Sequence, residues 1–196
     1  MANAVGVFLR PGAKAVSMAD AGGFIEWVMG ESEGEALVDL RRILVGGLVG
    51  AIAGGLGTLA FSALLALAVV LGAFEPTQFG ELAGLAGIGD PIVGEGNPRV
   101  GFAIFVAGGM TTWPFLFASL HHYLPGWRMA ASGITFAAIG WSGFAIAFYS
   151  GQTGVSLLLF LVLTFVGQCL YGLVLGFVFE YVEPRVDVAF VGTTFQ

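Results

Sequence analysis

The residues best suited to chemistry in this chain are two adjacent imidazoles, His121 and His122. Neighbouring side chains on a helix point about 100° apart, so this pair is not expected to chelate one metal ion. One of them would hold a haem iron only where a second chain supplied the other ligand. The alternative is an interfacial belt with Tyr123 and Trp127, which anchors helix ends at the lipid headgroups. We therefore predict neither a metal nor a cofactor in this chain.

The last apolar run carries three polar, uncharged side chains, Thr164, Gln168 and Tyr171. They are four and three residues apart, so a helix places them on one face. A carboxamide surrounded by hydrocarbon needs hydrogen-bond partners, and such side chains commonly bond to a neighbouring helix. The favoured interpretation is that Gln168 joins two helices. The alternative is that it forms a polar point on the path of a small molecule.

The second apolar run contains Thr111, Thr112 and Pro114 near its middle. Proline removes the helical hydrogen bond to the carbonyl of Met110, so we expect a kink there. A threonine hydroxyl can satisfy part of what is freed. Kinks of this kind occur in transporters and in inert bundles alike, so the motif by itself does not choose between the two.

Ionisable side chains are almost absent from the apolar runs. Between the ends of the four runs there is no Asp, Glu, Lys or His, and the one Arg, Arg128, lies next to the end of a run. Proton relays, ion-coupled transporters and voltage sensors place charges inside the membrane. Proteases and hydrolases need a positioned base or a metal. The sequence disfavours all of these classes and predicts a protein that is not an enzyme.

Four apolar runs position these residues, and they cover residues 43–74, 100–120, 127–149 and 155–179. Each exceeds the roughly 20 residues that a helix needs to cross the hydrocarbon of a bilayer. The chain of 196 residues is 57% hydrophobic and 10% charged. This composition excludes a water-soluble globule, which is about a quarter charged. We predict an all-α integral membrane protein with four transmembrane helices and the lipid bilayer as its first partner.

The charged residues predict the orientation. Thirteen acidic and seven basic residues give a net charge of −6, and nucleic acid is not an expected partner because phosphate binding needs clustered cations. By the positive-inside rule both chain ends are predicted to be cytoplasmic and the protein to lie in the plasma membrane, with only Arg99 on the outer side. The basic residues assigned to the cytoplasmic side are Arg10, Lys14, Arg41, Arg42, Arg128 and Arg185.

The predicted organisation follows from this orientation. Residues 1–40 form a cytoplasmic or interfacial segment, residues 41–182 form the membrane domain, and residues 183–196 form a cytoplasmic tail. Ser32 and Glu35 have capping-box spacing, which predicts that the first helix begins near Ser32.

The first outer loop is predicted to contain a short interfacial helix over residues 76–87, lying as a lid over the outer end of the bundle. Gly87, Gly89 and the pair Asp90-Pro91 would loosen and end it. Its expected apolar face consists of Phe79, Leu82, Ala83 and Ala86.

Small residues repeat at four-residue spacing in the first and last runs. Helices in lipid associate by close backbone approach over such residues, because no hydrophobic force acts between them. We therefore predict tight packing there, within the bundle or against another chain. One row of the first run is Gly46, Gly50 and Gly54, the parallel row is Gly47, Ala51 and Gly55, and the last run has Gly172 and Gly176.

Three motifs within residues 41–182 carry a resemblance. They are the glycine-rich first run, Gly-Glu-Leu-Ala-Gly-Leu at residues 80–85, and Gly-Gln-Cys-Leu-Tyr-Gly-Leu-Val-Leu-Gly at residues 167–176. With them the chain resembles a family of small four-span membrane proteins of unknown function that is common in halophilic archaea. A histidine often stands in that family where this chain has Gln168, and the departure argues against a haem or proton role at that position. The resemblance implies a fold and no reaction, and relatives accompany genes for respiratory haem–copper oxidases.

We predict from these observations a non-catalytic accessory or assembly subunit of a larger membrane complex. The resemblance implies that this complex is a respiratory haem–copper oxidase. Other membrane-protein subunits are then expected partners, contacted through the glycine rows and the acidic N-terminal segment. The alternative is a channel or facilitator for a small neutral solute or gas, with Gln168, Thr112 and the kink at Pro114 on its path.

Overall fold

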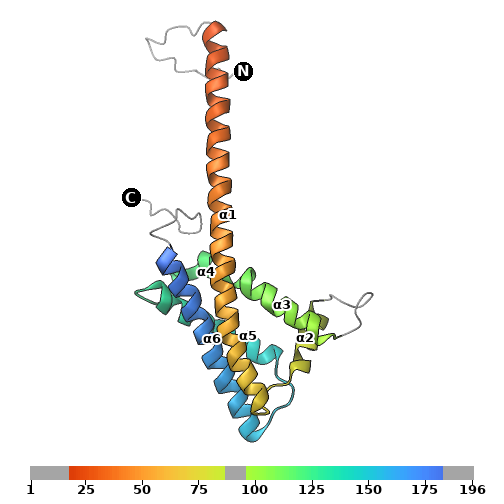
Figure 1. The fold of residues 1–196 in the computed structure, drawn as a ribbon. Helices are drawn as coiled ribbons and strands as arrows, with labels where there is room; N and C mark the ends of the chain where they lie inside the picture. Colours follow the sequence, from red (N-terminus) through yellow and green to blue (C-terminus); the bar gives the residue numbers. More distant parts are fainter. Residues whose placement is uncertain (1–17, 87–95, 183–196) are drawn as a thin grey trace, which may run out of the picture. The chain divides into compact units, whose positions relative to one another are not determined.

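The computed structural model describes residues 18–86 and 96–182, and it describes side chains from Leu40 onward. The features predicted at Arg10, Lys14 and Arg185, and the loop glycines at 87 and 89, lie outside the described residues. The described part is helical and contains no strand (Figure 1). Its elements are α1 (Met18–Val70), η1 (Pro76–Gln78), α2 (Phe79–Leu85), α3 (Pro98–Met110), α4 (Thr112–Leu120), η2 (His121–Tyr123), α5 (Met129–Ala147) and α6 (Gly154–Val182).

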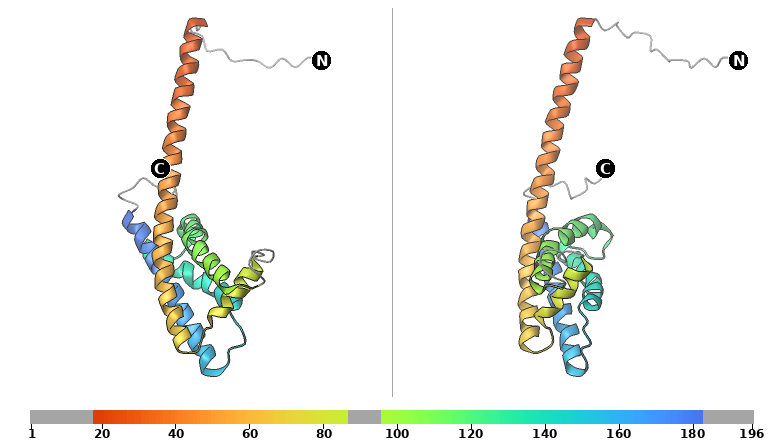
Figure 2. Two further views of the ribbon diagram at one scale, coloured as in Figure 1. Left: turned by 45° about the vertical axis from the view of Figure 1, so that its right-hand side comes forward. Right: turned by 90° about the vertical axis from the view of Figure 1, so that its right-hand side faces the viewer.

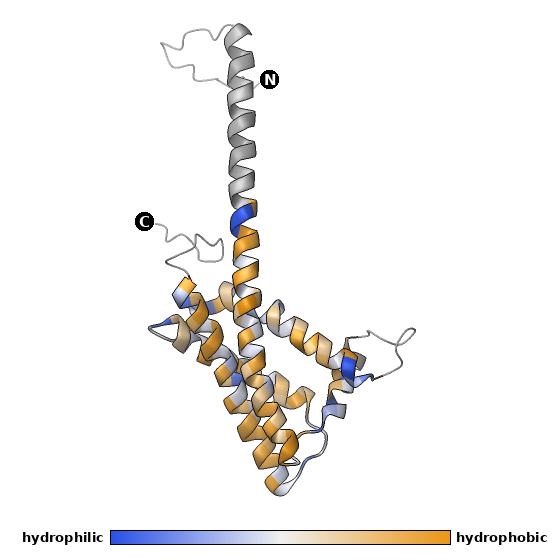
Figure 3. Cartoon of the chain, viewed as in Figure 1, coloured by the Kyte–Doolittle hydropathy of each residue, from blue (hydrophilic) through white to orange (hydrophobic). Residues whose placement is uncertain are grey.

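Four helical segments of the described chain are long and apolar enough to cross a membrane: Leu40–Val70, Pro98–Tyr123, Met129–Ala147 and Gly154–Val182. Figure 3 shows apolar residues along each of them. The shortest, Met129–Ala147, has 19 residues, and at about 1.5 Å per residue it approaches the roughly 30 Å of a hydrocarbon core. The predictions of an all-α fold and of four membrane-length helices are confirmed for the described residues.

The first helix begins earlier than predicted. Helix α1 starts at Met18, so Ser32 and Glu35 lie inside it and do not cap it. A capping box favours a helix start without enforcing one, and no proline lies between Met18 and Ser32 to end the helix upstream. The chain divides into two compact units, Met1–Arg41 and Arg42–Gln196, and the site described below lies in the second.

The loop after α1 forms two short helical pieces, η1 and α2, where one short helix was predicted. Glu75 and Gln78 cap the start of η1 reciprocally, and the Glu75 amide donates to Gln78 Oε1 at 2.9 Å. The Gln78 side chain also donates to the carbonyl of Phe148 at 3.1 Å and to the Ser150 hydroxyl. These bonds hold the loop against the end of α5, and Phe79 and Ala83 of α2 are buried.

The second membrane-length segment is interrupted at Thr111, between α3 and α4. Thr111 has non-helical angles, φ −122° and ψ −67°, three residues before the proline that was expected to disturb the helix. Pro114 has no N–H for the carbonyl of Met110. The Thr111 hydroxyl donates to the carbonyl of Ala107 at 2.7 Å, so the threonine supports the chain next to the break.

The glycine rows of α1 differ in what they contact. A Cβ at Gly54 would overlap the carbonyl oxygen of Gly109 and lie 2.6 Å from the Pro114 ring, and a Cβ at Gly50 would lie 3.3 Å from Pro114. A Cβ at Gly47, in the parallel row, would have no atom within 4 Å. The first row therefore packs closely against the backbone and the proline at the break between α3 and α4. In the parallel row, a Cβ at Gly55 would meet only the side chain of Met110, at 3.6 Å.

Helices α5 and α6 pack closely over another set of glycines. A Cβ at Gly172 would overlap the carbonyl oxygen of Gly133 and lie 2.5 Å from the Cβ of Ala137. A Cβ at Gly176 would overlap the carbonyl oxygen of Met129. The pair in α6 thus packs against α5 within this chain. Its counterpart Gly133 escaped the sequence analysis because no second glycine lies four residues from it.

Two further contacts complete the frame of the bundle. Arg128 Nε donates to Glu180 Oε1 at 3.0 Å, which joins the start of α5 to the end of α6. From Arg42 onward, α1 lies beside α6 in all three views (Figures 1 and 2). A Cβ at Gly57 of α1 would lie 2.7 Å from the Tyr171 ring of α6.

We expect the substitution Gly172→Ala to destabilise the protein by about 1–3 kcal/mol, because the new methyl group must displace backbone of α5. The matched control is Gly47→Ala, where a Cβ meets open space and alanine favours the helix. Unfolding of the purified proteins in mixed micelles by increasing SDS measures both. Equal stability of the two variants would contradict the contact between α5 and α6.

Candidate functional site

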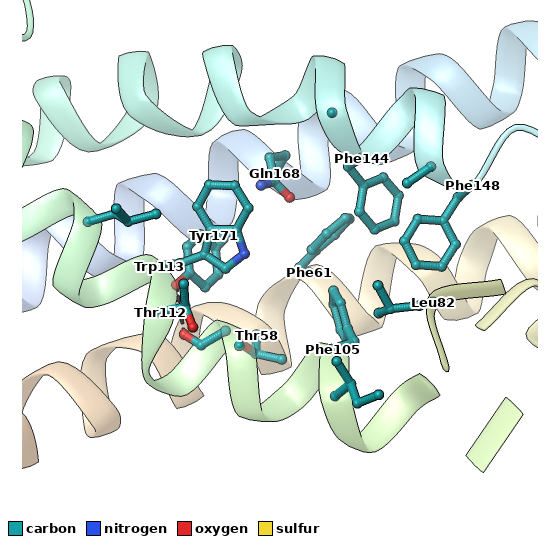
Figure 4. Close-up of a pocket in the computed structure, with 16 residues that line it drawn as sticks. Thr58, Phe61, Leu82, Phe105, Thr112, Trp113, Phe144, Phe148, Gln168 and Tyr171 are labelled. Atoms are coloured by element: carbon teal, nitrogen blue, oxygen red, sulfur yellow. Dashed lines mark hydrogen bonds between the residues drawn. The ribbon is translucent and has the colours of Figure 1, made fainter. Parts of the chain in front are cut away.

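A cavity of about 330 Å³ lies among the membrane-length helices of the second unit (Figure 4). Helices α1 and α6 contribute the buried lining residues Thr58, Phe61, Gln168 and Tyr171. Helices α3, α4 and α5 supply the remaining walls, with Leu82 of α2 at one end. Residues from six helices therefore meet around one space.

One end of the cavity is formed by phenylalanine rings from three helices, Phe61, Phe105, Phe144 and Phe148 (Figure 4). The ring centroids of Phe61 and Phe144 lie 4.9 Å apart, those of Phe61 and Phe105 lie 5.6 Å apart, and those of Phe144 and Phe148 lie 4.3 Å apart. Such tilted and stacked rings form an apolar surface that suits another ring or a hydrocarbon chain. We call these four residues the phenylalanine cluster.

The opposite end of the cavity carries its polar groups, Thr58, Thr112, Trp113, Gln168 and Tyr171 (Figure 4). The Tyr171 hydroxyl is already engaged, because it donates to the carbonyl of Gly109 at 2.7 Å. That carbonyl belongs to the close contact between α1 and α3. Tyr171 thus joins α6 to α3 and forms a wall of the cavity.

The prediction was that Gln168 joins two helices by a hydrogen bond, and the structure shows no such bond among the described residues. Its side chain is 5% exposed, yet its carboxamide makes no hydrogen bond to any residue that the structure describes. Bonds across helices come from its neighbours on the same face: Tyr171, and Thr164, whose hydroxyl accepts from Trp141 Nε1 at 3.0 Å. Gly140 on α5 leaves room above the carboxamide, since a Cβ there would lie 3.7 Å from Gln168 Nε2.

Thr58 is the second polar group of the cavity without a protein partner. It is 4% exposed, and its hydroxyl oxygen has no hydrogen-bond partner within the described chain. Leaving a buried hydroxyl unpaired costs about 1–3 kcal/mol, and lipid offers no substitute partner. A Cβ at Gly109 would overlap this oxygen, so the Thr58 hydroxyl packs against α3 in the close contact between α1 and α3.

The mouth of the cavity is marked by its exposed lining residues. Thr112 and Leu116 of α4 and Gly143 of α5 are exposed, whereas the lining residues of α1 and α6 are buried. The cavity thus opens sideways between α4 and α5, on a surface of membrane-length helices. A molecule dissolved in lipid can reach it from that side.

The remaining predicted site residues lie elsewhere. His121 is buried and its Nδ1 lies 3.0 Å from the carbonyl of Ala118. The ring centroids of His121 and His122 are 3.7 Å apart, so the expectation that these side chains point apart is wrong, because rotation about the side-chain bonds brings the rings together. Neither histidine lines the cavity, and the described residues contain no group of three or more His, Cys, Asp or Glu that could hold a metal.

Thr111 lies beside a second, smaller cavity of about 270 Å³, which the predicted glycine rows also line. The sequence analysis found Gln168, Thr112 and Tyr171 of the main cavity but missed Thr58 and the phenylalanine cluster. Thr58 gave one available signal, because it is one of only two hydroxyl residues, with Ser62, in the first apolar run. The phenylalanines gave none, because aromatic residues are frequent throughout the membrane domain.

Membrane-length helices around an apolar cavity with a few uncharged polar groups define a multi-pass helical membrane protein with an internal pocket. The sequence profile of a family of unknown function, DUF6789, matches residues 44–190. The chain belongs to this family. Comparisons with curated proteins and with solved structures gave no match. The resemblance to a family of unknown function is confirmed, and its occurrence in halophilic archaea stays a prediction.

We expect Thr58→Val to leave the stability of the protein unchanged or to raise it, because valine removes an unpaired hydroxyl and keeps the shape. The matched control is Thr164→Val, which removes the partner of Trp141 Nε1 and should cost on the order of 1 kcal/mol. Unfolding by SDS in mixed micelles compares the two. A loss for Thr58→Val as large as that for Thr164→Val would show that the Thr58 hydroxyl has a protein partner.

Proposed function

We propose that this chain is a non-catalytic protein of the plasma membrane that binds a small neutral molecule inside its helical bundle, and that it does so as an accessory subunit of a larger membrane complex. The observation that carries the proposal is the cavity, which joins the phenylalanine cluster to the buried side chain of Gln168, whose carboxamide has no hydrogen-bond partner among the described residues. Small-molecule sites are typically concave and mostly apolar, with a few polar groups that fix orientation.

The neutrality of the molecule follows from the lining. The residues around the cavity include no Asp, Glu, Lys, Arg or His. A charged molecule entering it would lose its hydration without gaining an opposite charge, which is costly in a region of low dielectric. A neutral molecule loses little hydration and gains contact with the phenylalanine cluster.

The role as a subunit is supported by the part of α1 that precedes the span. Residues 18–39 are helical and contain six acidic residues and no basic one. A helix of this charge favours a partner with a basic surface, because complementary potentials steer association. Arg41, Arg42 and Arg128 support a cytoplasmic location for this segment and for both chain ends. A respiratory haem–copper oxidase is the first complex to examine.

A channel for a neutral solute or gas is the second expectation from the sequence, and it stays a prediction. We favour binding over passage because the exposed residues of the cavity lie on one side, between α4 and α5.

We expect protein in lipid nanodiscs to bind naphthalene saturably, above the uptake of empty nanodiscs. The substitution Gly143→Leu should abolish this binding, because a Cβ at Gly143 has no atom within 4 Å and a leucine there extends from the cavity wall. Gly108→Leu, on the facing helix, is the second filling variant, and Gly47→Leu, outside this cavity, is the control. Unsaturable uptake by the wild type, or binding unchanged in both filling variants, would overturn the proposed site.

We expect the protein purified from its native membrane in mild detergent to migrate with other membrane subunits. Deletion of residues 18–39 should release them at low ionic strength if the acidic helix provides the contact, and added salt should weaken the wild-type association because it screens exposed charges. Size-exclusion chromatography with mass spectrometry of the co-migrating chains measures this. A lone monomer or homodimer would contradict the role as an accessory subunit.

A further inference from the structure

We propose that the molecule bound in the cavity is an uncharged aromatic amide, whose N–H and C=O lie on one edge of a flat ring system and pair with the carboxamide of Gln168. This inference rests on the proposed function, because it names the class of molecule for the same cavity. It goes further by assigning the recognition of that molecule to one side chain and the binding of its body to the aromatic rings beside that side chain.

The carboxamide of Gln168 is open to the cavity. The side chain is 5% exposed, and its two polar atoms make no hydrogen bond to a described residue. Neither atom is fully enclosed by protein, whereas the Thr58 hydroxyl oxygen is. Figure 4 shows the carboxamide pointing into the cavity. Gln168 therefore offers both a donor and an acceptor to a bound molecule, and the Thr58 hydroxyl offers neither.

Aromatic rings lie on both sides of this carboxamide. A Cβ at Gly140 of α5 would lie 3.1 Å from the Trp113 ring and 3.7 Å from Gln168 Nε2, so the indole and the amide nitrogen approach the same point of α5. On the other side the Phe61 ring packs against Gly167, the residue before Gln168, where a Cβ would lie 2.5 Å from the ring. Trp113 and Phe61 thus flank the carboxamide (Figure 4). A flat ring system attached to a group that pairs with Gln168 meets aromatic surface at once.

The chemistry of a carboxamide favours a partner that both donates and accepts. Gln168 presents an N–H beside its carbonyl oxygen. An amide with its N–H and C=O on one edge, as in a lactam or a primary carboxamide, can form two parallel hydrogen bonds with it. A ketone or an ether only accepts, so it would leave Gln168 Oε1 unpaired in a dry site, which is unfavourable. One hydroxyl group cannot align with both atoms at once.

The size and charge of the cavity agree with this class of molecule. A cavity of about 150 Å³ is large enough to bind benzene, so a space of about 330 Å³ can enclose a fused pair of rings. The lining includes no charged residue, which favours a neutral amide over an amine or a carboxylate. The remainder of a longer molecule would leave through the mouth at Thr112, Leu116 and Gly143, where it meets lipid.

The test compares three probes of similar size, each corrected for its partition into empty nanodiscs. Naphthalene has no polar group, 2-quinolone carries adjacent N–H and C=O groups, and 1-methyl-2-quinolone keeps the C=O and lacks the N–H. We expect the wild type to bind 2-quinolone about tenfold more tightly than 1-methyl-2-quinolone, because the methylated probe loses one hydrogen bond and leaves Gln168 Oε1 unpaired. Fluorescence titration of the protein in nanodiscs measures the three affinities.

Two variants assign this preference to one side chain. Gln168→Met removes the carboxamide and keeps a side chain of similar length. In this variant naphthalene should still bind, and the ratio of the two quinolone affinities should fall to the value that the bulk of the methyl group alone produces. Thr58→Val is the matched control, because its enclosed hydroxyl cannot reach the probe, and it should keep the wild-type ratio.

The outcomes separate this inference from the proposed function. If naphthalene binds and Gly143→Leu blocks it, but the wild type shows the same quinolone ratio as Gln168→Met, the cavity is a binding site and the assignment of an amide is wrong. A preference for 2-quinolone that is lost in Thr58→Val, or a loss of naphthalene binding in Gln168→Met, also overturns the role of the carboxamide. If no probe binds saturably to the wild type, both the inference and the proposed function fall.

Discussion

The structure depends on one constraint, which is that lipid supplies no hydrogen-bond partner to a polar group. Two bonds between helices meet it, since Trp141 donates to Thr164 and Tyr171 donates to Gly109. A third bond lies within one segment, from Thr111 to the carbonyl of Ala107. Each of these bonds also holds a helix or a break in place. Gln168 and Thr58 depart from this pattern, and both line the same cavity. The Thr58 hydroxyl is packed against Gly109 of α3, and the Gln168 carboxamide is left as the polar group that the cavity offers to a bound molecule.

Close backbone contacts between glycines hold the helices that form the walls of the cavity, and the cavity opens between α4 and α5. The contact between Gly133 and Gly172 fixes α5 on α6, and that between Gly54 and Gly109 fixes α1 against α3. Phenylalanine side chains then span the space that remains between the helices. The break at Thr111 redirects the chain into α4, whose Thr112 and Leu116 form part of the mouth. Glycine contacts therefore set the walls of the cavity, and the broken helix contributes to its opening.

The proposed function joins the two features that the chain combines, an uncharged internal cavity and an acidic helical segment before the first span. A cavity without charge cannot relay protons or bind ions strongly, so binding of a neutral molecule is the chemistry that its lining supports. No residue of the acidic segment is among the described lining of that cavity.

The sequence by itself determined the class of the protein, the number of membrane-length helices and their approximate bounds, because composition and run length report directly on transfer into hydrocarbon. It also identified Gln168, Thr112 and Tyr171, since polar residues in apolar runs are conspicuous. It misplaced the start of α1, because capping signals are local preferences that a continuing helix overrides. Only the tertiary structure decided that Tyr171 bonds to Gly109, 62 residues away. It also decided that the Gln168 carboxamide has no partner among the described residues and that four phenylalanines line the same cavity. Hydrogen-bond partners and cavity walls come from helices distant in the chain, and the spacing of residues within one helix cannot specify which of its neighbours they will meet.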